Sequence, residues 1–372
     1  MPYICQRCAF GEIISNFAHL NMIIMDNTFA QRLVNARKIR CMSQRELCNS
    51  VDGKVSPTSI AKYEKGLMMP SSDVLILLSN ALNMKLDYFF RPFTIDIDPS
   101  KFEFRKKSSL GSKKVESIKH LVCSEIEKYL EIEAIIGITS KFCLDYSNTT
   151  VEGENEAKLL ALRLRNDLNI GSDAIVSAID LLESVGVKII EIDHDRSFSG
   201  TCNEAGGLPV IVVNKNLCSE RKRLTIFHEL GHLLMHCADG VDKEKMCNVF
   251  ANEVLIPSDK FKNLIGESRH DISLVELQAI QREYGISVDA LMVKAAQLNI
   301  ITERRFTSYH KKKNALPSFK EAVEQSLYPM EHTFRFERLV YRALASEVIS
   351  FSKAAALLDK SVNEVRDTLN LM

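Results

Sequence analysis

Apolar residues recur at helical spacing in short runs through the first hundred residues, and polar residues that favour helix starts separate the runs. Phe29, Leu33 and Ala36, for example, keep one face of a first helix apolar. The segment 43–46 reads Ser-Gln-Arg-Glu, a capping box that predicts the start of a second helix. Three further helices are expected to begin at Ser56 with Pro57 in the first position, at Ser71 or Ser72, and near Leu86. Residues 26–93 are therefore expected to form a domain of five short helices.

The apolar runs become longer after this domain. A basic linker is expected to lead into one long amphipathic helix over 113–135, followed by helices over 152–168 and 174–186. The runs 187–192 and 209–214 are the only good strand candidates, and a glycine-bearing loop is expected between them. The remainder of the chain is expected to be helical over 274–284, 288–298, 319–325, 334–347, 352–358 and 362–369. This pattern predicts a mainly α-helical protein with a small β-sheet.

The most specific chemical signal lies in the apolar segment 224–236, which we expect to be helical. Its centre, His228-Glu229-Leu230-Gly231-His232, is an H-E-x-x-H sequence. Two histidines four positions apart lie on one face of a helix, so both imidazoles can reach one metal ion. Glu229 points beside that ion and suits a general base, because a zinc-bound water whose pKa falls to about 7 needs a nearby carboxylate to take its proton. The segment therefore predicts a zinc site that uses both histidines.

A third metal ligand is expected on the following helix. A glycine-containing turn should end the H-E-x-x-H helix, and a new helix is predicted over 242–255. If the new helix folds back antiparallel, Glu244 faces His232, and a carboxylate is one of the ligand types that complete such a site. Glu253 falls on roughly the opposite face, so only one of the two can serve. Glu244, Glu253 and Asp242 are the candidates.

Charge and cysteine content indicate which partners and which cellular compartment to expect. The 48 Lys and Arg balance the 48 Asp and Glu, but residues 32–65 hold eight basic and three acidic side chains, so one end of the chain is basic. No apolar run approaches the roughly 18 residues of a membrane helix, and residues 1–25 lack a signal-peptide core, so we expect a cytoplasmic protein without membrane contact. Most of the ten cysteines stand singly and fit reduced thiols. Cys5-x-x-Cys8 lacks the further ligands of a structural zinc site.

Three segments of the first domain form a recognisable pattern. They are Ser-Gln-x-x-Leu at 43–47, Ile-Ala-Lys-Tyr-Glu-Lys-Gly at 60–66, and Pro70 before a leucine-rich helix. Together they resemble the phage-repressor (XRE-type) helix-turn-helix domain, whose third helix enters the major groove. The resemblance implies a double-stranded DNA operator as a partner and a homodimer as the default state. By position, the candidate base readers are Ser56, Thr58, Ser59 and Lys62, and the candidate phosphate contacts are Gln44, Arg45 and Lys65.

A second set of motifs spans about 155–300. Phe-His-Glu-Leu-Gly-His at 227–232 is followed by Glu-Lys-Met-Cys-Asn-Val-Phe-Ala-Asn-Glu-Val-Leu-Ile-Pro at 244–257. These residues resemble the ImmA/IrrE family of zinc peptidases. The resemblance implies Zn²⁺ as the cofactor, with Glu229 as the general base and three ligands: His228, His232 and Glu244. It also implies a substrate class, because members of the family cut repressors of the helix-turn-helix type during stress or mobile-element induction.

Five parts are expected along the chain. They are an N-terminal arm (1–25), the helix-turn-helix domain (26–93), a basic linker with the connecting helix (94–150), a zincin-like α+β peptidase domain (151–300) and a helical C-terminal region (301–372). Our first hypothesis is a DNA-binding transcriptional regulator fused to a zinc endopeptidase that cleaves a repressor-type protein or itself. The alternative is a non-cleaving repressor or antitoxin that uses the peptidase fold to sense a signal or to bind a toxin–antitoxin partner. The complete H-E-x-x-H sequence favours the first.

Overall fold

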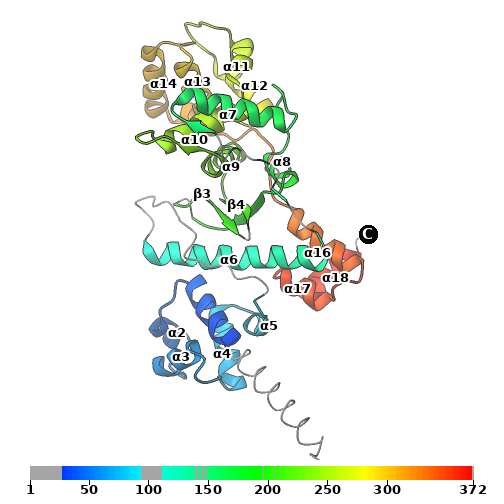
Figure 1. The fold of residues 1–372 in the computed structure, drawn as a ribbon. Coiled ribbons are helices and arrows are strands. Elements are labelled where there is room, and N and C mark those ends of the chain that lie inside the picture. The colour runs from blue at the N-terminus through cyan, green and yellow to red at the C-terminus, as the bar shows by residue number, and fades with distance from the viewer. Residues whose placement is uncertain are drawn as a thin grey trace, which may run out of the picture. The chain divides into compact units, whose positions relative to one another are not determined.

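The computed structural model describes residues 27–93 and 111–370, apart from 139, 140, 143, 145, 147, 148, 196 and 206. The described residues form two compact units (Figure 1). Unit 1 contains residues 27–93, 111–138 and 336–370, and unit 2 contains the described residues from 141 to 335. Unit 2 is therefore an insertion in the sequence of unit 1, and the expected C-terminal region is divided between the two units. The expected arm 1–25, with Cys5 and Cys8, lies outside the described residues.

Unit 1 begins with the short helices that the sequence predicts. A helix over 27–39 is followed by α2 (Gln44–Ser50), α3 (Pro57–Glu64), α4 (Ser72–Leu82) and α5 (Leu86–Phe90). Ser43 and Glu46 form the predicted capping box of α2, and the Oγ atom of Ser56 accepts the backbone N–H of Ser59 at the start of α3. Their apolar side chains share one buried core, which includes Phe29, Leu33, Leu47, Ile60 and Leu78. The prediction of five short helices is confirmed.

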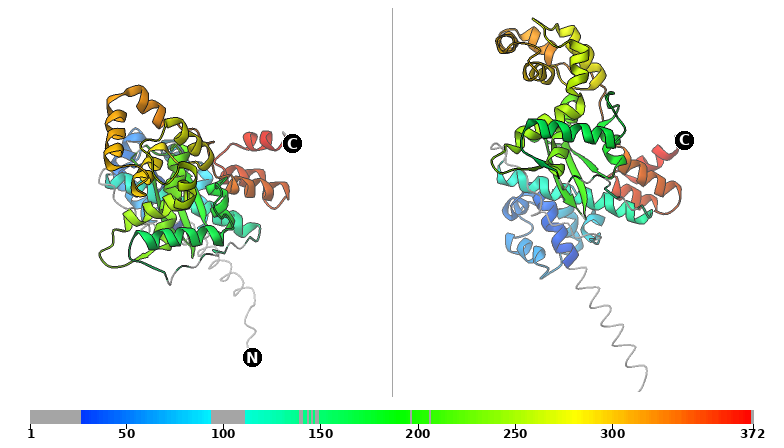
Figure 2. Two further views of the ribbon diagram at one scale, coloured as in Figure 1. Left: turned by 90° about the horizontal axis from the view of Figure 1, so that it is seen from above. Right: turned by 45° about the horizontal axis from the view of Figure 1, so that its top comes forward.

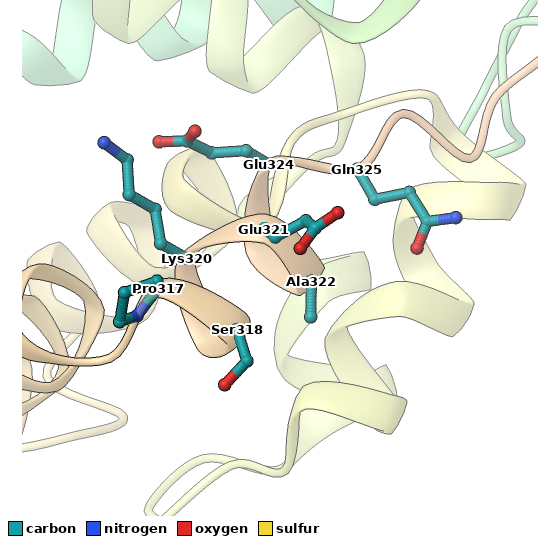
Figure 3. Close-up of a pocket in the computed structure, with 7 residues that line it drawn as sticks. All are labelled: Pro317, Ser318, Lys320, Glu321, Ala322, Glu324 and Gln325. Atoms are coloured by element: carbon teal, nitrogen blue, oxygen red, sulfur yellow. The ribbon is translucent and has the colours of Figure 1, made fainter.

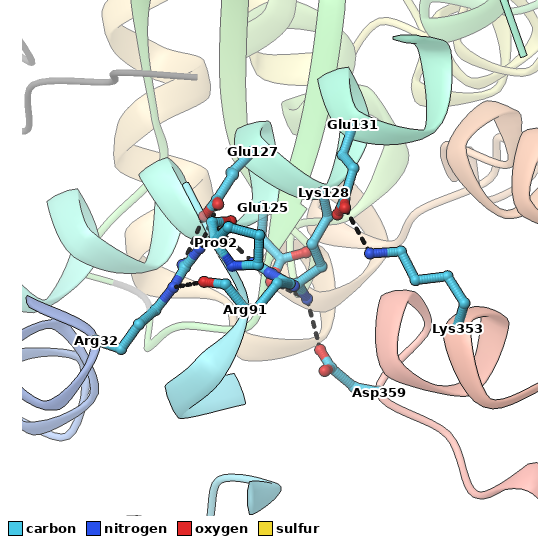
Figure 4. Close-up of polar contacts among 9 residues, drawn as sticks. All are labelled: Arg32, Arg91, Pro92, Glu125, Glu127, Lys128, Glu131, Lys353 and Asp359. Carbon is cyan, nitrogen blue, oxygen red and sulfur yellow. Dashed lines mark hydrogen bonds and ion pairs between the residues drawn. The ribbon is translucent and has the colours of Figure 1, made fainter. Parts of the chain in front are cut away.

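The long helix α6 (Ser112–Ile135) joins the parts of unit 1 through charged side chains (Figure 4). Arg32, on the first helix, is 1% exposed, and its Nη1 atom donates to Oε2 of Glu127 on α6 at 2.7 Å. Further along α6, Nζ of Lys128 donates to Oδ2 of Asp359 at 2.6 Å. These pairs join residues 95 and 231 positions apart in the chain. Two buried charged residues of α6 thus contact the first helix and the segment after α17 (Phe351–Leu357). The sequence predicts only the apolar face of α6 and not these charged contacts.

The last three helices also belong to unit 1. They are α16 (Arg335–Ala345), α17 (Phe351–Leu357) and α18 (Val362–Asn370). Their buried apolar side chains share a core with Tyr129 and Ile132 in the second half of α6, and Figure 2 shows these helices in red beside that end of α6. Lys85, just before α5, donates through Nζ to the carbonyl oxygen of Ala355 at 3.1 Å. The C-terminal helices thus pack against the helix-turn-helix segment as well as against α6.

Unit 2 contains a three-stranded sheet of order β2-β4-β3, together with a short two-stranded sheet. Its strands are β1 (Thr150–Val151), β2 (Lys188–Ile192), β3 (Gly200–Ala205), β4 (Leu208–Asn214) and β5 (His236–Cys237). Strand β2 runs parallel to β4, whereas β3 is antiparallel to β4 and pairs Cys202 with Ile211. The prediction of a loop between β2 and β4 is wrong over 200–205. The sequence Gly-Thr-Cys-Asn-Glu-Ala has little apolar alternation, and its pairing with β4 makes it a strand.

The other regular elements described in unit 2 are helices. They are α7 (Glu154–Asp167), α8 (Ala178–Ser184), α9 (Ser219–Leu234), α10 (Lys243–Leu255), α11 (Ser258–Ile265), α12 (Leu274–Tyr284), α13 (Val288–Gln297), α14 (Glu303–Ala315) and α15 (Pro317–Glu324). Helix α8 begins at Ala178 rather than at 174, because Ser177 caps it there. Helix α9 begins five residues before the predicted segment and ends two residues earlier than expected, since His236 pairs with Thr150 in the short sheet. Among the described residues, none of the helices is both long and apolar enough to cross a membrane.

Helix α9 lies at the centre of the unit 2 core and packs against α10, β3 and β4. Two glycines allow this close packing. A Cβ atom on Gly231 would lie 3.1 Å from Cδ1 of Phe250 on α10. A Cβ atom on Gly200 would lie 2.6 Å from Cγ2 of Thr225 and 3.5 Å from Cγ of Glu229. Strand β3 is thereby held directly beside the turn of α9 that carries the H-E-x-x-H sequence.

Candidate metal centre

Three side chains from two helices bring their ligand atoms together. His228 and His232 lie one turn apart on α9, and their Nε2 atoms are 3.0 Å from each other. Glu244, in the first turn of α10, places Oε2 3.3 Å from Nε2 of His228 and Oε1 3.4 Å from Nε2 of His232. In the part of the chain that the structure describes, this is the one group of three or more His, Cys, Asp or Glu side chains with ligand atoms this close.

The spacing and chemistry of this cluster fit a tetrahedral zinc ion. Nitrogen and oxygen ligands about 2.0–2.1 Å from such an ion lie about 3.3 Å from one another. The three separations of 3.0, 3.3 and 3.4 Å match that value. Two imidazole nitrogens and one carboxylate are also the donor set of a catalytic zinc site with an open position. When both Nε2 atoms carry lone pairs, their approach to 3.0 Å is unfavourable unless a cation lies between them.

The other ring nitrogens of both histidines contact α10. Nδ1 of His228 lies 3.0 Å from Oδ1 of Asn248, and Nδ1 of His232 lies 3.1 Å from Sγ of Cys247. When Nδ1 donates in these bonds, Nε2 keeps its lone pair for a metal. Neither Cys247 nor Asn248 was predicted to contact the site. Cys247 and Asn248 lie three and four residues after Glu244, so they share its helix face. This spacing could have placed both residues at the site.

The other two acidic candidates have different partners. Glu253 is 3% exposed, and its Oε2 atom accepts a hydrogen bond from Nζ of Lys294 at 2.7 Å. Burial raises the pKa of Glu253, but Lys294 and the bonds from Ser258 outweigh that effect and hold it below its usual value. Asp242 caps α10, and its Oδ1 atom accepts the backbone N–H of Lys245. The structure thus brings Glu244, and neither Glu253 nor Asp242, into the histidine cluster.

Glu229 lies on α9 between the two histidines, and it is 9% exposed. Where α9 packs against β3, Glu229 lies next to Gly200, the first residue of β3. Among the described strands, β3 pairs only with β4, so it is an edge strand of the three-stranded sheet. The candidate base and a strand edge are therefore adjacent.

The expected DNA-contacting residues lie on α2 and α3 and on the residues that flank α3. Arg45, Thr58, Lys62 and Lys65 are exposed. Ser56 and Ser59 form the cap of α3, with their Oγ atoms 2.9 Å apart. Gln44 is partly buried, and its Nε2 atom donates to Oε2 of Glu64 at 2.8 Å. Most of the predicted contact residues thus have a free outer surface, whereas Gln44 has a partner within unit 1.

A hollow elsewhere in unit 2 contains none of the candidate metal ligands. It is formed by one helix, α15, and the residue that follows it, Gln325 (Figure 3). Figure 3 shows Lys320, Glu321 and Glu324 projecting around it. None of the cluster residues lines this hollow. The candidate metal centre on α9 and α10 is therefore separate from this hollow.

Two family models match the chain. Residues 182–295 match a model of the M78 peptidases, described as the IrrE N-terminal-like domain, and residues 35–89 match a helix-turn-helix model. The chain joins a helix-turn-helix domain to an ImmA/IrrE-type domain. The first match includes His228, His232 and Glu244, so the ImmA/IrrE-type region contains the whole cluster. No curated protein matches the chain.

Both resemblances inferred from the motifs are confirmed by these matches. The ImmA/IrrE-type match runs from α8 to α13 and supports a hydrolase of the metallopeptidase type. The helix-turn-helix match runs from the first helix to α5 and supports a DNA-binding domain. The chain therefore has the architecture of a regulator joined to a peptidase.

Proposed function

We propose that this protein is a cytoplasmic, operator-binding transcriptional regulator whose inserted domain is a zinc-dependent endopeptidase. The cluster of His228, His232 and Glu244 beside Glu229 carries this proposal. In our proposal these three side chains hold Zn²⁺. The ion, when bound, supplies a Lewis acid that polarises a peptide carbonyl and makes water more acidic.

The chain's own residues perform the proton transfers in this proposal. Glu229 accepts a proton from the attacking water and then donates it to the leaving amine. The low exposure of Glu229 favours this role, because a carboxylate with little surrounding water exchanges a proton with its reaction partner rather than with solvent. Asn248 and Cys247 hold the two histidine rings from the side opposite the cluster.

In our proposal, the edge of β3 that faces away from β4 receives the substrate. An extended peptide that adds to this edge as a further strand would bind through main-chain hydrogen bonds, which do not depend on its side chains. Such a peptide would pass Gly200, where the absence of a side chain leaves the backbone close to Glu229. We propose that the substrate is an extended segment of a repressor-type protein, or of this chain itself, because peptidase and helix-turn-helix domains share one polypeptide.

A non-cleaving regulator is the second candidate. In that case unit 2 binds a metal or a toxin–antitoxin partner and changes operator binding without hydrolysis. The exposed position of Lys62 and Lys65 on a helix-turn-helix domain supports DNA binding in either case. The presence of Glu229 in addition to the three candidate ligands favours hydrolysis, because binding a metal alone does not need a base.

The decisive experiment combines metal analysis with cleavage. The purified full chain is incubated, with and without added zinc, with helix-turn-helix repressors encoded beside it, and the products are identified by mass spectrometry. We expect zinc-dependent cleavage that Glu229→Gln reduces at least about 100-fold, as for loss of a general base. Glu267→Gln, an exposed carboxylate on the same unit, serves as the control and should cleave normally. Cleavage that Glu229→Gln leaves unchanged would refute the peptidase, and a chain that binds zinc without cleaving would support the second candidate.

A further inference from the structure

Cys247 is fully buried in the core of unit 2 and contacts a candidate metal ligand directly. Its side chain is 0% exposed, and Sγ lies 3.1 Å from Nδ1 of His232. The ring of His232 is itself nearly buried, with a side-chain exposure of 1%. The contact is therefore a fixed part of the core, on the side of the ring away from Glu244.

The direction of this hydrogen bond decides which nitrogen of His232 can bind a metal. If the thiol donates to Nδ1, then Nε2 of the neutral ring carries the proton and has no lone pair to offer. If Nδ1 donates to Sγ, then Nε2 carries a lone pair toward His228 and Glu244. Only the second arrangement is compatible with a metal at the cluster, and in it the sulfur acts as the acceptor.

Helix α10 carries Cys247 on the same face as the candidate ligand Glu244. Glu244, Cys247 and Asn248 lie at positions i, i+3 and i+4 of one helix, so they share one face. That face meets α9 where Gly231 permits close approach, since a Cβ atom on Gly231 would lie 3.4 Å from Sγ of Cys247. The same helix thus brings one candidate ligand and holds the rings of the other two.

We propose that Cys247 is a positioning residue that holds His232 in its metal-binding orientation and tautomer. The inference rests on the proposed metal function of the cluster. Histidine ligands usually donate their second N–H to a carboxylate, a backbone carbonyl or water. A thiol is a weaker and neutral acceptor, so Cys247 fixes the ring without adding negative charge near the metal.

The test measures metal binding in the full chain rather than activity. Zinc affinity is determined by competition with a chelator, and the d–d absorption of the Co²⁺-loaded protein reports ligand geometry. Cys247→Ala and Cys247→Val remove the acceptor, whereas Cys247→Ser keeps one of similar size. Cys48→Ala is the matched control, because Cys48 is a buried cysteine in unit 1.

We expect Cys247→Ala and Cys247→Val to raise the zinc Kd by about 10-fold or more, the usual cost of losing such a partner, and to alter the Co²⁺ spectrum. Cys247→Ser should stay within about threefold of the wild type, and Cys48→Ala should match it. If Cys247→Ala does not fold, the comparison of Val with Ser decides. Unchanged zinc binding in the non-accepting variants, or equal losses in Ser and Val, would overturn the inference while leaving the metal site intact. A wild-type chain that binds no zinc would overturn the proposed metal function and this inference together.

Discussion

The carboxylate of Glu253 lies 2.7 Å from the ammonium nitrogen of Lys294, and both side chains are at least 96% buried. The pair occupies the far end of α10 from Glu244, which is 59% exposed at its side chain. Two acidic residues on one helix thus have different environments. Glu253 is paired with Lys294 in the core, and Glu244 is the residue that we propose as a metal ligand.

This difference predicts opposite effects of the two substitutions. Glu253→Ala leaves Lys294 buried without its partner, so the free energy of unfolding of unit 2 should fall by about 3–5 kcal/mol. Glu244→Ala should change the stability of the metal-free protein by less than about 0.5 kcal/mol but abolish stoichiometric zinc binding. Urea unfolding and elemental analysis measure the two effects. Zinc loss in a folded Glu253→Ala protein together with zinc retention in Glu244→Ala would contradict our assignment.

Gly200 should tolerate no side chain. A Cβ atom there would lie 2.6 Å from Cγ2 of Thr225 and 3.0 Å from the carbonyl oxygen of Val212, so Gly200→Ala must move β3 relative to α9. We expect a loss of about 1–3 kcal/mol in stability and, because the displaced strand lies beside Glu229, a reduced rate of cleavage. Gly111→Ala is the control, since its Cβ atom would meet no atom within 4 Å. Equal stability and activity of the two variants would show that the contact at β3 is not tight.

The ion pair of Arg32 and Glu127 should stabilise unit 1. Glu127 also accepts a bond from Arg91 at 3.2 Å, so Glu127→Ala leaves two guanidinium groups without their carboxylate. We expect a loss of about 3–5 kcal/mol, seen as faster hydrogen exchange in α6 and in the helix over 27–39. Exchange in α9 and α10 should not change, which provides an internal control. A smaller loss in Arg32→Met with Glu127→Met than in Glu127→Ala would identify the unpaired charge as the cause.

The capping box of α2 predicts that the stability of this helix depends on pH. The backbone N–H and the hydroxyl of Ser43, together with Lys113, lower the pKa of Glu46 from 4.5 to about 2. A carboxyl group with a lowered pKa stabilises the fold above pH 4.5, and this contribution is lost as the pH falls from about 4.5 to about 2. The stability difference between wild type and Glu46→Gln should therefore shrink over that range. The measurement is hydrogen exchange of the α2 amides at several pH values, and a constant difference would refute the effect.

Lys62 and Lys65 should contribute differently to operator binding. Lys62 lies within α3, where a side chain can reach base edges, so Lys62→Ala should cost about 1–3 kcal/mol on the operator and reduce discrimination against random DNA. Lys65 follows the end of α3 and is expected to contact phosphate, so Lys65→Ala should weaken both complexes equally and reduce the salt slope by about 1. Binding titrations at several salt concentrations test both. An equal loss on both DNAs for Lys62→Ala would remove it from the base-reading residues.

Local signals in the sequence predicted most helices, because their causes are local. The capping box at Ser43, the Ser56-Pro57 start and the periodic apolar face of α6 all depend on residues within one or two turns. Strand β3 was not predicted, and α14 was predicted only as part of the helical C-terminal region, without bounds of its own. Strand β3 depends on its pairing with β4, and α14 is highly polar with only Tyr309 buried, so neither has an apolar pattern of its own.

The residues of the metal cluster could be predicted from the sequence, whereas the ion pairs in the surrounding core could not. The spacing of His228 and His232 requires only a helix, and Glu244 requires only that the next helix fold back. Lys294 lies 41 residues from its partner Glu253, and Arg32 lies 95 residues from its partner Glu127, so no short pattern indicates these two ion pairs. The membership of α16–α18 in unit 1 likewise depends on contacts such as Lys128 with Asp359, which join distant parts of the chain.

The insertion of unit 2 within unit 1 changes what a self-cleavage event would look like. A single peptide bond broken between residues 141 and 335 would leave each fragment still carrying part of unit 1. The apolar core that α16–α18 share with α6, together with the ion pairs Lys128–Asp359 and Lys353–Glu131, would keep the two fragments associated. A nicked molecule would therefore migrate as two polypeptides under denaturing conditions and as one particle under native conditions.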